Sequence, residues 1–198
     1  MKIWEFVITG GPCAGKTVAL NIIRKELTEK GFKVIIGNET ATELICSGIF
    51  PWELEKVKFQ ELLMERAINK EKVIRKAAKH LEKDVVIFYD RGLLDGKAYV
   101  SDEEFSRILE TNNFNEKQIN NQYDGVFHLV TAANGAEKFY TLSNNEARVE
   151  TMEEARILDK RTIDVWKDNE KLKIIDNSTD FEGKIERLLN EIYAILEV

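Results

Sequence analysis

The segment ITGGPCAGKT, residues 8–17, constrains the fold more than any other part of the sequence. It follows a branched apolar run and matches the pattern G-x-x-x-x-G-K-[ST] from Gly10 to Thr17. Gly10 and Gly15 allow backbone angles that a side chain disfavours, so several N–H groups can point into one concavity. A helix that begins at Lys16 adds its dipole to the attraction for an anion. The pattern therefore predicts a strand, a phosphate-binding loop and a helix in succession.

The same loop supplies the groups that nucleotide phosphates need. Lys16 reaches the β and γ phosphates as a compact charge, and the Thr17 hydroxyl is a ligand for Mg²⁺. We interpret Cys13 as a tolerated small residue at a variable position; the alternative is a redox-sensitive thiol. The loop residues expected to contact ATP, with GTP as the alternative, are Gly10, Gly11, Pro12, Cys13, Ala14, Gly15, Lys16, Thr17 and Val18.

Length and charge exclude several classes of protein. The chain has 198 residues, enough for one domain with a sizeable core, and its net charge of −6 provides no basic field for nucleic acid or anionic lipid. No apolar run approaches the roughly 20 residues that span a bilayer. Two cysteines and no recognisable signal peptide predict a reducing, cytoplasmic location. The composition indicates nothing about self-association.

Strand and helix patterns alternate along the chain, which predicts an α/β fold with a parallel sheet. Strand patterns occupy residues 4–9, 32–37, 84–89, 126–130 and 172–175, and helix patterns occupy 16–30, 41–46 and 54–83. Capping boxes beginning at Ser101, Thr151 and Thr179 open three further helices, the first of which continues through Leu109. In the last two helices, periodicity places inward the residues Ala155, Leu158, Thr162, Val165, Trp166, Ile185, Leu188, Leu189 and Ile192. We predict a single three-layer α/β/α domain over residues 1–198.

Polar residues follow the predicted strands at the edge where ligands of parallel sheets bind. Asp90 ends a buried strand, as a Mg²⁺-holding carboxylate does in phosphate-loop proteins; a turn-capping role is the alternative. Arg91 follows it and suits a phosphate or an acceptor group. Glu39 suits a base for an acceptor hydroxyl or, alternatively, the solvated first turn of a helix. Asn177 follows the last strand, where the purine of a bound nucleotide is expected.

Three arginines lie in residues 134–168, a charged segment that we interpret as a lid, while residues 39–83 form a helical acceptor side. Arginines above a phosphate loop stabilise the charge on a phosphoryl group in transfer. We expect Arg148 and Arg156 to act in this way. Arg161 lies about 140° from Arg156 around a helix, so both serve one phosphate only if the lid closes, and at least one of the three arginines is expected to be solvated.

The stretch YDRGLLDGKAY, residues 89–99, resembles the motif of thymidylate kinases and related nucleoside kinases. The resemblance implies that Asp90 and Arg91 contact acceptor and phosphate, that Glu39 contacts the acceptor, and that lid arginines close over the phosphates. Phe59 and Gln60 are similar to the base-contacting Phe-Gln pair of deoxynucleoside kinases. Periodicity alone makes Phe59 a core residue and Gln60 a surface residue.

Nearly the whole chain resembles a family of small phosphate-loop proteins, the AAA-like ATP-binding proteins, which is itself similar to the ribosylnicotinamide kinase domain. The resemblance rests on ITGGPCAGKT, YDRGLLDGKAY, YDGVFHLVTAANGAEKFYT, NNEAR with EEARILD, and IDNSTDFEGKI. It implies a P-loop NTPase fold with the strand order 2-3-1-4-5 of nucleotide kinases, and nucleotide binding. The family does not define the acceptor.

Two functions are consistent with these features. The first is a Mg²⁺-dependent kinase that transfers the γ-phosphoryl group of ATP to a nucleoside-like or phosphorylated small molecule. The second is a switch that binds ATP or GTP, hydrolyses it slowly and has no small acceptor. The acceptor-side residues Glu39, Gln60, Asp90 and Arg91 favour the kinase, and the GTPase signatures D-x-x-G after the third strand and N-K-x-D are missing.

Overall fold

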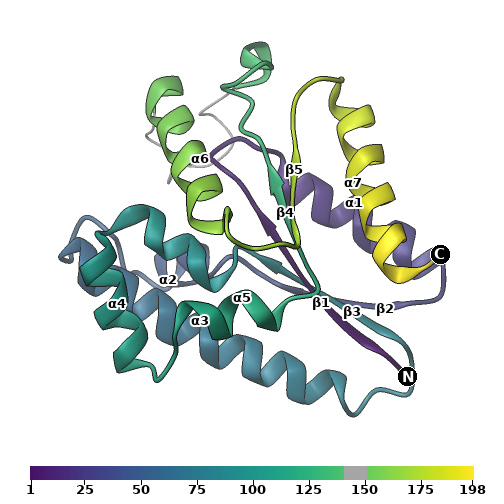
Figure 1. The fold of residues 1–198 in the computed structure, drawn as a ribbon, viewed down its shortest axis with the longest axis horizontal. Helices are drawn as coiled ribbons and strands as arrows, with labels where there is room; N and C mark the ends of the chain where they lie inside the picture. Colours follow the sequence, from purple (N-terminus) through teal and green to yellow (C-terminus); the bar gives the residue numbers. More distant parts are fainter. Residues whose placement is uncertain (141–150) are drawn as a thin grey trace.

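A parallel β-sheet forms the centre of the fold. The structure is a computed structural model and describes residues 1–140 and 151–198. Within these residues the sheet has five strands in the order β2-β3-β1-β4-β5, and every neighbouring pair is parallel (Figure 1). The strands are β1 (Ile3–Thr9), β2 (Lys33–Gly37), β3 (Val85–Asp90), β4 (Gly125–Leu129) and β5 (Leu172–Ile175). The predicted P-loop NTPase fold and strand order are therefore confirmed.

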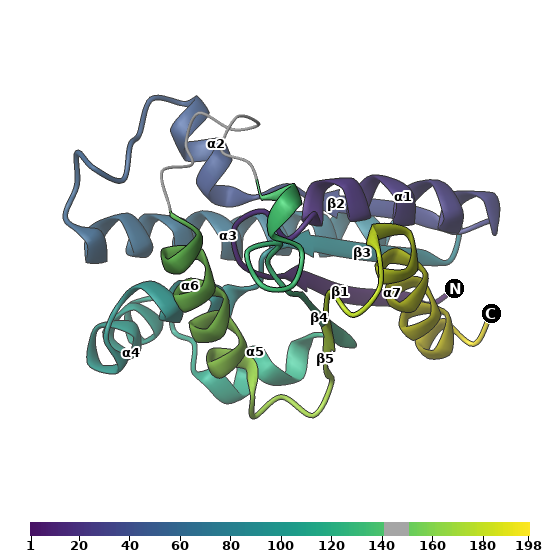
Figure 2. The ribbon, with the colours of Figure 1, turned by 90° about the horizontal axis from the view of Figure 1, so that it is seen from above.

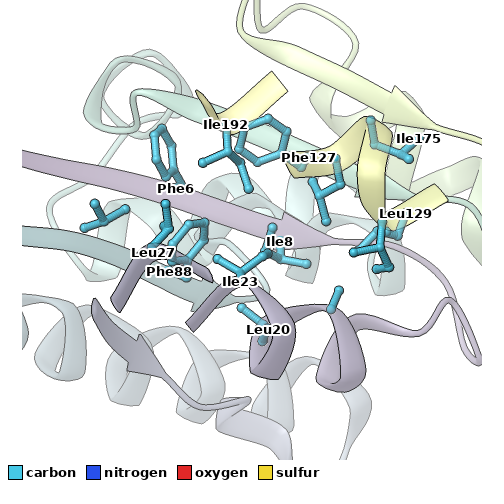
Figure 3. Packing of buried hydrophobic residues seen from close by; sticks show 14 of the residues in the cluster. Phe6, Ile8, Leu20, Ile23, Leu27, Phe88, Phe127, Leu129, Ile175 and Ile192 are labelled. Atoms are coloured by element: carbon cyan, nitrogen blue, oxygen red, sulfur yellow. The ribbon is translucent and has the colours of Figure 1, made fainter. Parts of the chain in front are cut away.

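One face of the sheet is covered by α1 (Lys16–Glu29) and α7 (Phe181–Leu196). Because side chains alternate along a strand, Phe6 and Ile8 of β1 point to this face, where they pack with the apolar stripes of both helices (Figure 3). Burying one such phenylalanine or isoleucine side chain stabilises the fold by about 1.5–3 kcal/mol. The layer anchors the helix that follows the phosphate loop.

The opposite face packs against α3 (Lys56–Ala78), α4 (Asp102–Thr111), α5 (Glu116–Gln122) and α6 (Met152–Trp166). Val7 of β1 and Ile87 of β3 supply the sheet side of this second core, and Phe105, Ile119 and Trp166 supply the helical side. Figures 1 and 2 show these helices on the side of the sheet away from α1 and α7. All three layers of the predicted sandwich are present.

Shorter elements complete the chain around the carboxyl ends of the strands. Helix α2 (Thr40–Cys46) follows β2, and the 3₁₀ helices η1 (Leu93–Tyr99) and η2 (Glu137–Phe139) follow β3 and β4. Figure 2 shows the connection from α2 to α3 extending away from the sheet. Among the described residues, no helix combines the length and the apolar character required to cross a membrane.

Most predicted elements are present, and the differences have local causes. The long helix was predicted over residues 54–83, but α3 begins after Glu55, whose ψ of 138° is extended, and ends at Ala78. The last helix begins at Phe181 rather than at a Thr179 cap, because the Asp180 side chain accepts the hydrogen bond from the Gly183 N–H. The Thr179 hydroxyl instead donates to the Asp180 carbonyl at 3.1 Å.

Capping boxes decide three of the helix starts. Those predicted at Ser101 and Thr151 open α4 and α6, and each has both reciprocal hydrogen bonds. A third, at Asn115, opens α5, a helix that the sequence patterns did not predict. Helix α5 has seven residues and buries only Ile119 among them, so its sequence offers no apolar repeat of helical spacing.

Candidate active site

The glycine-rich loop joins β1 to α1 at the carboxyl edge of the sheet. Gly10 has φ 143°, and a Cβ atom there would lie 2.1 Å from the Leu129 carbonyl oxygen, so the residue has to be glycine. Lys16 is the first helical residue, and its Nζ donates to the carbonyls of Gly10 at 3.2 Å and Gly11 at 3.3 Å. The loop thus brings its lysine and the N-terminus of α1 together, as the motif predicts.

Lys16 lies among charged groups from other strands. Burial lowers the pKa of its ammonium group, and the neighbouring Arg91 lowers it further, while Asp90, Glu39 and Asp95 oppose the shift. Two cations therefore face the loop close enough to repel each other. Lys16, Arg91 and the N-terminus of α1 therefore meet at this edge, and the carboxylates of Glu39, Asp90 and Asp95 balance the charge of the two cations.

Glu39 and Arg91 form an ion pair across the loop, with Arg91 Nε 2.8 Å from Glu39 Oε1. Burial alone would raise the pKa of Glu39, but the charges of Arg91 and Lys16 and the hydrogen bonds from Arg91 and Thr42 lower it to about 2. Glu39 is therefore ionised at every physiological pH. Arg91 Nη1 also donates to the Gly10 carbonyl at 3.2 Å, which brings the guanidinium to the phosphate loop.

Asp90 is paired with Ile8 in the sheet register, so it ends β3 beside the beginning of the phosphate loop. Its Oδ1 atom is buried and has no hydrogen-bond partner among the described residues. Burial raises the pKa of this carboxyl group, and Lys16 opposes the shift. A buried carboxylate oxygen without a partner is costly, and a cation shared with the Thr17 hydroxyl would satisfy it.

A single cavity of about 1110 Å³ runs past the phosphate loop and has two different ends. One end lies below α3 and α4 and is mostly apolar, with Phe59, Leu63, Met64, Phe105 and Ile108 in its wall. The other end lies between the segment after β4 and the start of α7, and its wall includes Gly135, Ala136, Phe139, Asn177 and Phe181. Glu39, Asp90 and Arg91 line the middle, so the predicted rim residues meet in one cavity.

Gln60 is the polar exception in the apolar end. The periodicity of α3 makes it a surface residue, but only 8% of it is exposed, and it lines the cavity. Its side-chain amide makes no hydrogen bond to any residue in 1–140 or 151–198. An amide that opens into a cavity and keeps a donor and an acceptor for a ligand is suited to the polar edge of that ligand.

Asn177 lines the opposite end, but its amide is already engaged. Its Nδ2 donates to the carbonyls of Thr131 at 2.8 Å and Asn134 at 2.7 Å, and its Oδ1 accepts from Lys184 Nζ at 2.8 Å. Asn177 therefore shapes this end of the cavity by tying the segment after β4 to the segment after β5. Contact between Asn177 and a nucleotide stays a prediction.

The predicted lid arginines are not gathered at one point. Arg156 Nε donates to the Ala133 carbonyl at 2.6 Å, which places this arginine beside the segment after β4. Arg161 lines a separate cavity of about 470 Å³ together with Lys97 and Asp164. Arg148 lies outside the described residues. Arg156 and Arg161 thus lie in different surroundings, as their angular separation around the helix predicts.

Sequence reasoning assigned no role to two buried carboxylates near the site. Asp95 of η1 accepts hydrogen bonds from Thr9 Oγ1 at 2.6 Å and Trp166 Nε1 at 2.7 Å, and Arg91 Nη1 lies 3.5 Å from it. Asp159 replaces the predicted Leu158 on the buried face of α6. The spacing of each residue is the signal that the sequence offers. Asp95 is four residues from Arg91, and Asp159 is four residues from the inward-facing Ala155, so each can lie on the same side of a helix as that residue.

A family model described as an AAA domain, AAA_28, matches residues 5–184. The chain belongs to this family. The resemblance that its motifs carry is thereby confirmed. No curated protein matches the sequence. Among solved structures, the chain is similar to deoxyadenosine kinase from M. mycoides with bound dATP, at 18% identity and a TM-score of 0.63. The match covers 95% of this chain and 98% of the kinase, so the two proteins share a fold over nearly their whole lengths.

Proposed function

We propose that this AAA-domain protein is a Mg²⁺-dependent kinase that transfers the γ-phosphoryl group of ATP to a nucleoside-like small molecule. One observation carries the proposal: the phosphate loop and the Gln60 side chain line the same cavity. A protein that only binds and hydrolyses a nucleotide has no need for a second compartment beside the γ-phosphate position. The size and the two unlike ends of the cavity suit two ligands that meet at Lys16.

The donor occupies the phosphate loop and the end of the cavity near α7. The loop amides and Lys16 bind its phosphates, and the exposed rings of Phe139 and Phe181 are suited to stack on its base. Thr17 and Asp90 provide hard oxygen atoms for Mg²⁺, and the unpartnered Asp90 Oδ1 fits that role. When bound, Mg²⁺ neutralises charge on the β and γ phosphates.

The acceptor occupies the apolar end. Its flat body packs between residues such as Phe59 and Met64, and Gln60 offers one donor and one acceptor to the edge of a base. The solved structure of the similar fold is that of a deoxyadenosine kinase, which is consistent with a nucleoside in this position. The mixed donor and acceptor character of Gln60 favours a nucleobase over a purely apolar group.

In the proposed reaction an acceptor hydroxyl oxygen forms a bond to the γ-phosphorus while the bond from that phosphorus to the ADP oxygen breaks. Glu39 accepts a hydrogen bond from the hydroxyl and orients it toward the phosphorus. Because the pKa of Glu39 is about 2, the carboxylate is a weak base. The proton therefore leaves the hydroxyl late, as a loose transition state permits, and passes to an oxygen of the newly formed phosphate ester. Arg91 stabilises the negative charge on the oxygens in transfer.

The experiment is transfer from [γ-³²P]ATP to a panel of nucleosides and phosphorylated metabolites, with products separated by chromatography. We expect a labelled product that depends on one class of nucleoside and disappears in Lys16→Met. If the protein releases only inorganic phosphate, and no acceptor in the panel accelerates ATP loss, the kinase proposal is wrong and the slow nucleotide switch takes its place.

A further inference from the structure

Asp159 is a buried carboxylate directly behind the phosphate loop. It lies on the inner face of α6, with 3% of the residue exposed. Its Oδ1 atom accepts hydrogen bonds from the Gly11 N–H at 2.8 Å and the Thr131 N–H at 3.1 Å, and it lies 3.0 Å from His128 Nε2. Burying a carboxylate is costly unless several donors satisfy it, so this position is expected to have a specific task.

The contact with Gly11 fixes one peptide unit of the loop. The Gly11 N–H and the Gly10 carbonyl belong to the same trans peptide, so they point in opposite directions. With the N–H held by Asp159, the carbonyl faces the cavity side, where it accepts hydrogen bonds from Lys16 Nζ and Arg91 Nη1, each at 3.2 Å. Two cations that the kinase proposal assigns to the phosphates are therefore held by a carbonyl whose orientation Asp159 sets.

The carbonyls of the rest of the loop are held by the segment after β4 and by α7. The Thr131 hydroxyl donates to the Pro12 carbonyl, and the Ala132 N–H donates to the Cys13 carbonyl at 3.2 Å. On the α7 side, the buried Lys184 ammonium donates to the carbonyls of Val130 at 2.7 Å and Ala14 at 3.4 Å. Asp159 is the contact that comes from α6, the helix that also carries Arg156.

We propose that Asp159 is a positioning residue for polyphosphate binding, which acts through the Gly10–Gly11 peptide on Lys16 and Arg91. The identity of the ligand rests on the proposed function. The hydrogen bond between Asp159 and the Gly11 N–H does not depend on it. The carboxylate acts as a fixed hydrogen-bond acceptor. An uncharged amide oxygen at the same place is therefore expected to replace it, whereas an apolar side chain of similar size is not.

The test compares Asp159→Asn with Asp159→Leu, and Asp164→Ala, an exposed aspartate of the same helix, is the control. Dissociation constants for ATP and for tripolyphosphate are measured by calorimetry with Mg²⁺, after thermal unfolding has shown that each variant folds. We expect Asp159→Leu to weaken both ligands by the same factor, about tenfold or more, as loss of a hydrogen bond to a charged group does. Asp159→Asn and Asp164→Ala should stay within about threefold of the wild type.

Unchanged tripolyphosphate binding by folded Asp159→Leu would overturn the proposal. A loss of affinity in Asp159→Asn equal to that in Asp159→Leu would also overturn it, because that result would indicate a role for the charge alone. If Asp159→Leu does not fold, hydrogen exchange of the Gly11 amide in the wild type tests the contact with Asp159 instead. The Gly11 amide should exchange slowly without nucleotide, and fast exchange at Gly11 refutes the contact. If the wild type binds neither ligand, the proposed function fails and the positioning role fails with it, while the exchange measurement still tests the contact between Asp159 and Gly11.

Discussion

Replacing Glu71 with glutamine is expected to remove a pH-dependent cost of folding. Glu71 lies on α3 and is 2% exposed; its Oε1 accepts from the Tyr123 hydroxyl at 2.9 Å and its Oε2 accepts from Arg75 Nη2 at 2.8 Å. Burial raises its pKa from 4.5 to about 7, although Arg75 and Tyr123 oppose the shift. The folded protein therefore binds this proton more tightly than the unfolded chain does.

The sign of the effect follows from that difference. The stability linked to the raised pKa is fully present below pH 4.5 and is lost as the pH rises to about 7. At about 1.4 kcal/mol for each tenfold change in proton affinity, the loss is about 3 kcal/mol. Glutamine at position 71 carries no such proton, so the variant should gain about that much stability relative to the wild type between pH 4.5 and 8.

Urea unfolding followed by tryptophan fluorescence at pH 5, 6, 7 and 8 measures this difference. Glu65→Gln, an exposed position on the same helix, is the control and should show a difference from the wild type that does not change with pH. If the difference between Glu71→Gln and the wild type stays constant over this range, or changes in the opposite direction, the reasoning is refuted. The second result would mean that Arg75 stabilises the ionised carboxylate more than burial penalises it.

Three further substitutions test the middle of the cavity and its two ends. Glu39→Gln should reduce phosphoryl transfer about 100-fold or more while ATP still binds, as followed by calorimetry; normal turnover would show that Glu39 does not orient the hydroxyl. Gln60→Leu should raise KM for the acceptor about tenfold and leave KM for ATP unchanged in steady-state kinetics, since an unpaired polar edge on the acceptor is costly; an equal rise for both substrates would contradict this assignment. Phe181→Ala should weaken ATP and GTP by about fivefold or more and leave tripolyphosphate unaffected, whereas Trp52→Ala, an aromatic 68% exposed and outside the cavity wall, should change neither. Equal loss of tripolyphosphate would mean that Phe181 supports the loop instead of the base.

The sequence contains most of the information for the sheet and for the phosphate loop. Apolar strands alternating with helices require a covered parallel sheet, and the spacing from Gly10 to Thr17 leaves few choices for the β1–α1 connection. The placement of Glu39, Asp90 and Arg91 follows in turn, because the carboxyl ends of parallel strands share one edge.

Buried polar side chains are the part that periodicity cannot predict. A helical repeat identifies the inner face of α6 but favours Leu158 over Asp159, since it takes no account of the donors that satisfy a carboxylate. Gln60 has the same difficulty: beside the apolar Phe59 it is expected at the surface, and only the cavity below α3 explains its burial. Such residues depend on partners from distant segments.

The central claim is that the loop around Lys16 binds the polyphosphate of a nucleotide, and titration calorimetry with Mg²⁺ and ATP tests it most directly. The wild type should bind one ATP per chain, and Lys16→Ala should weaken the binding by about tenfold or more, because the ammonium group contributes a charge-assisted contact. Absence of binding to both ATP and GTP in the wild type, or equal affinity in Lys16→Ala, would contradict the claim.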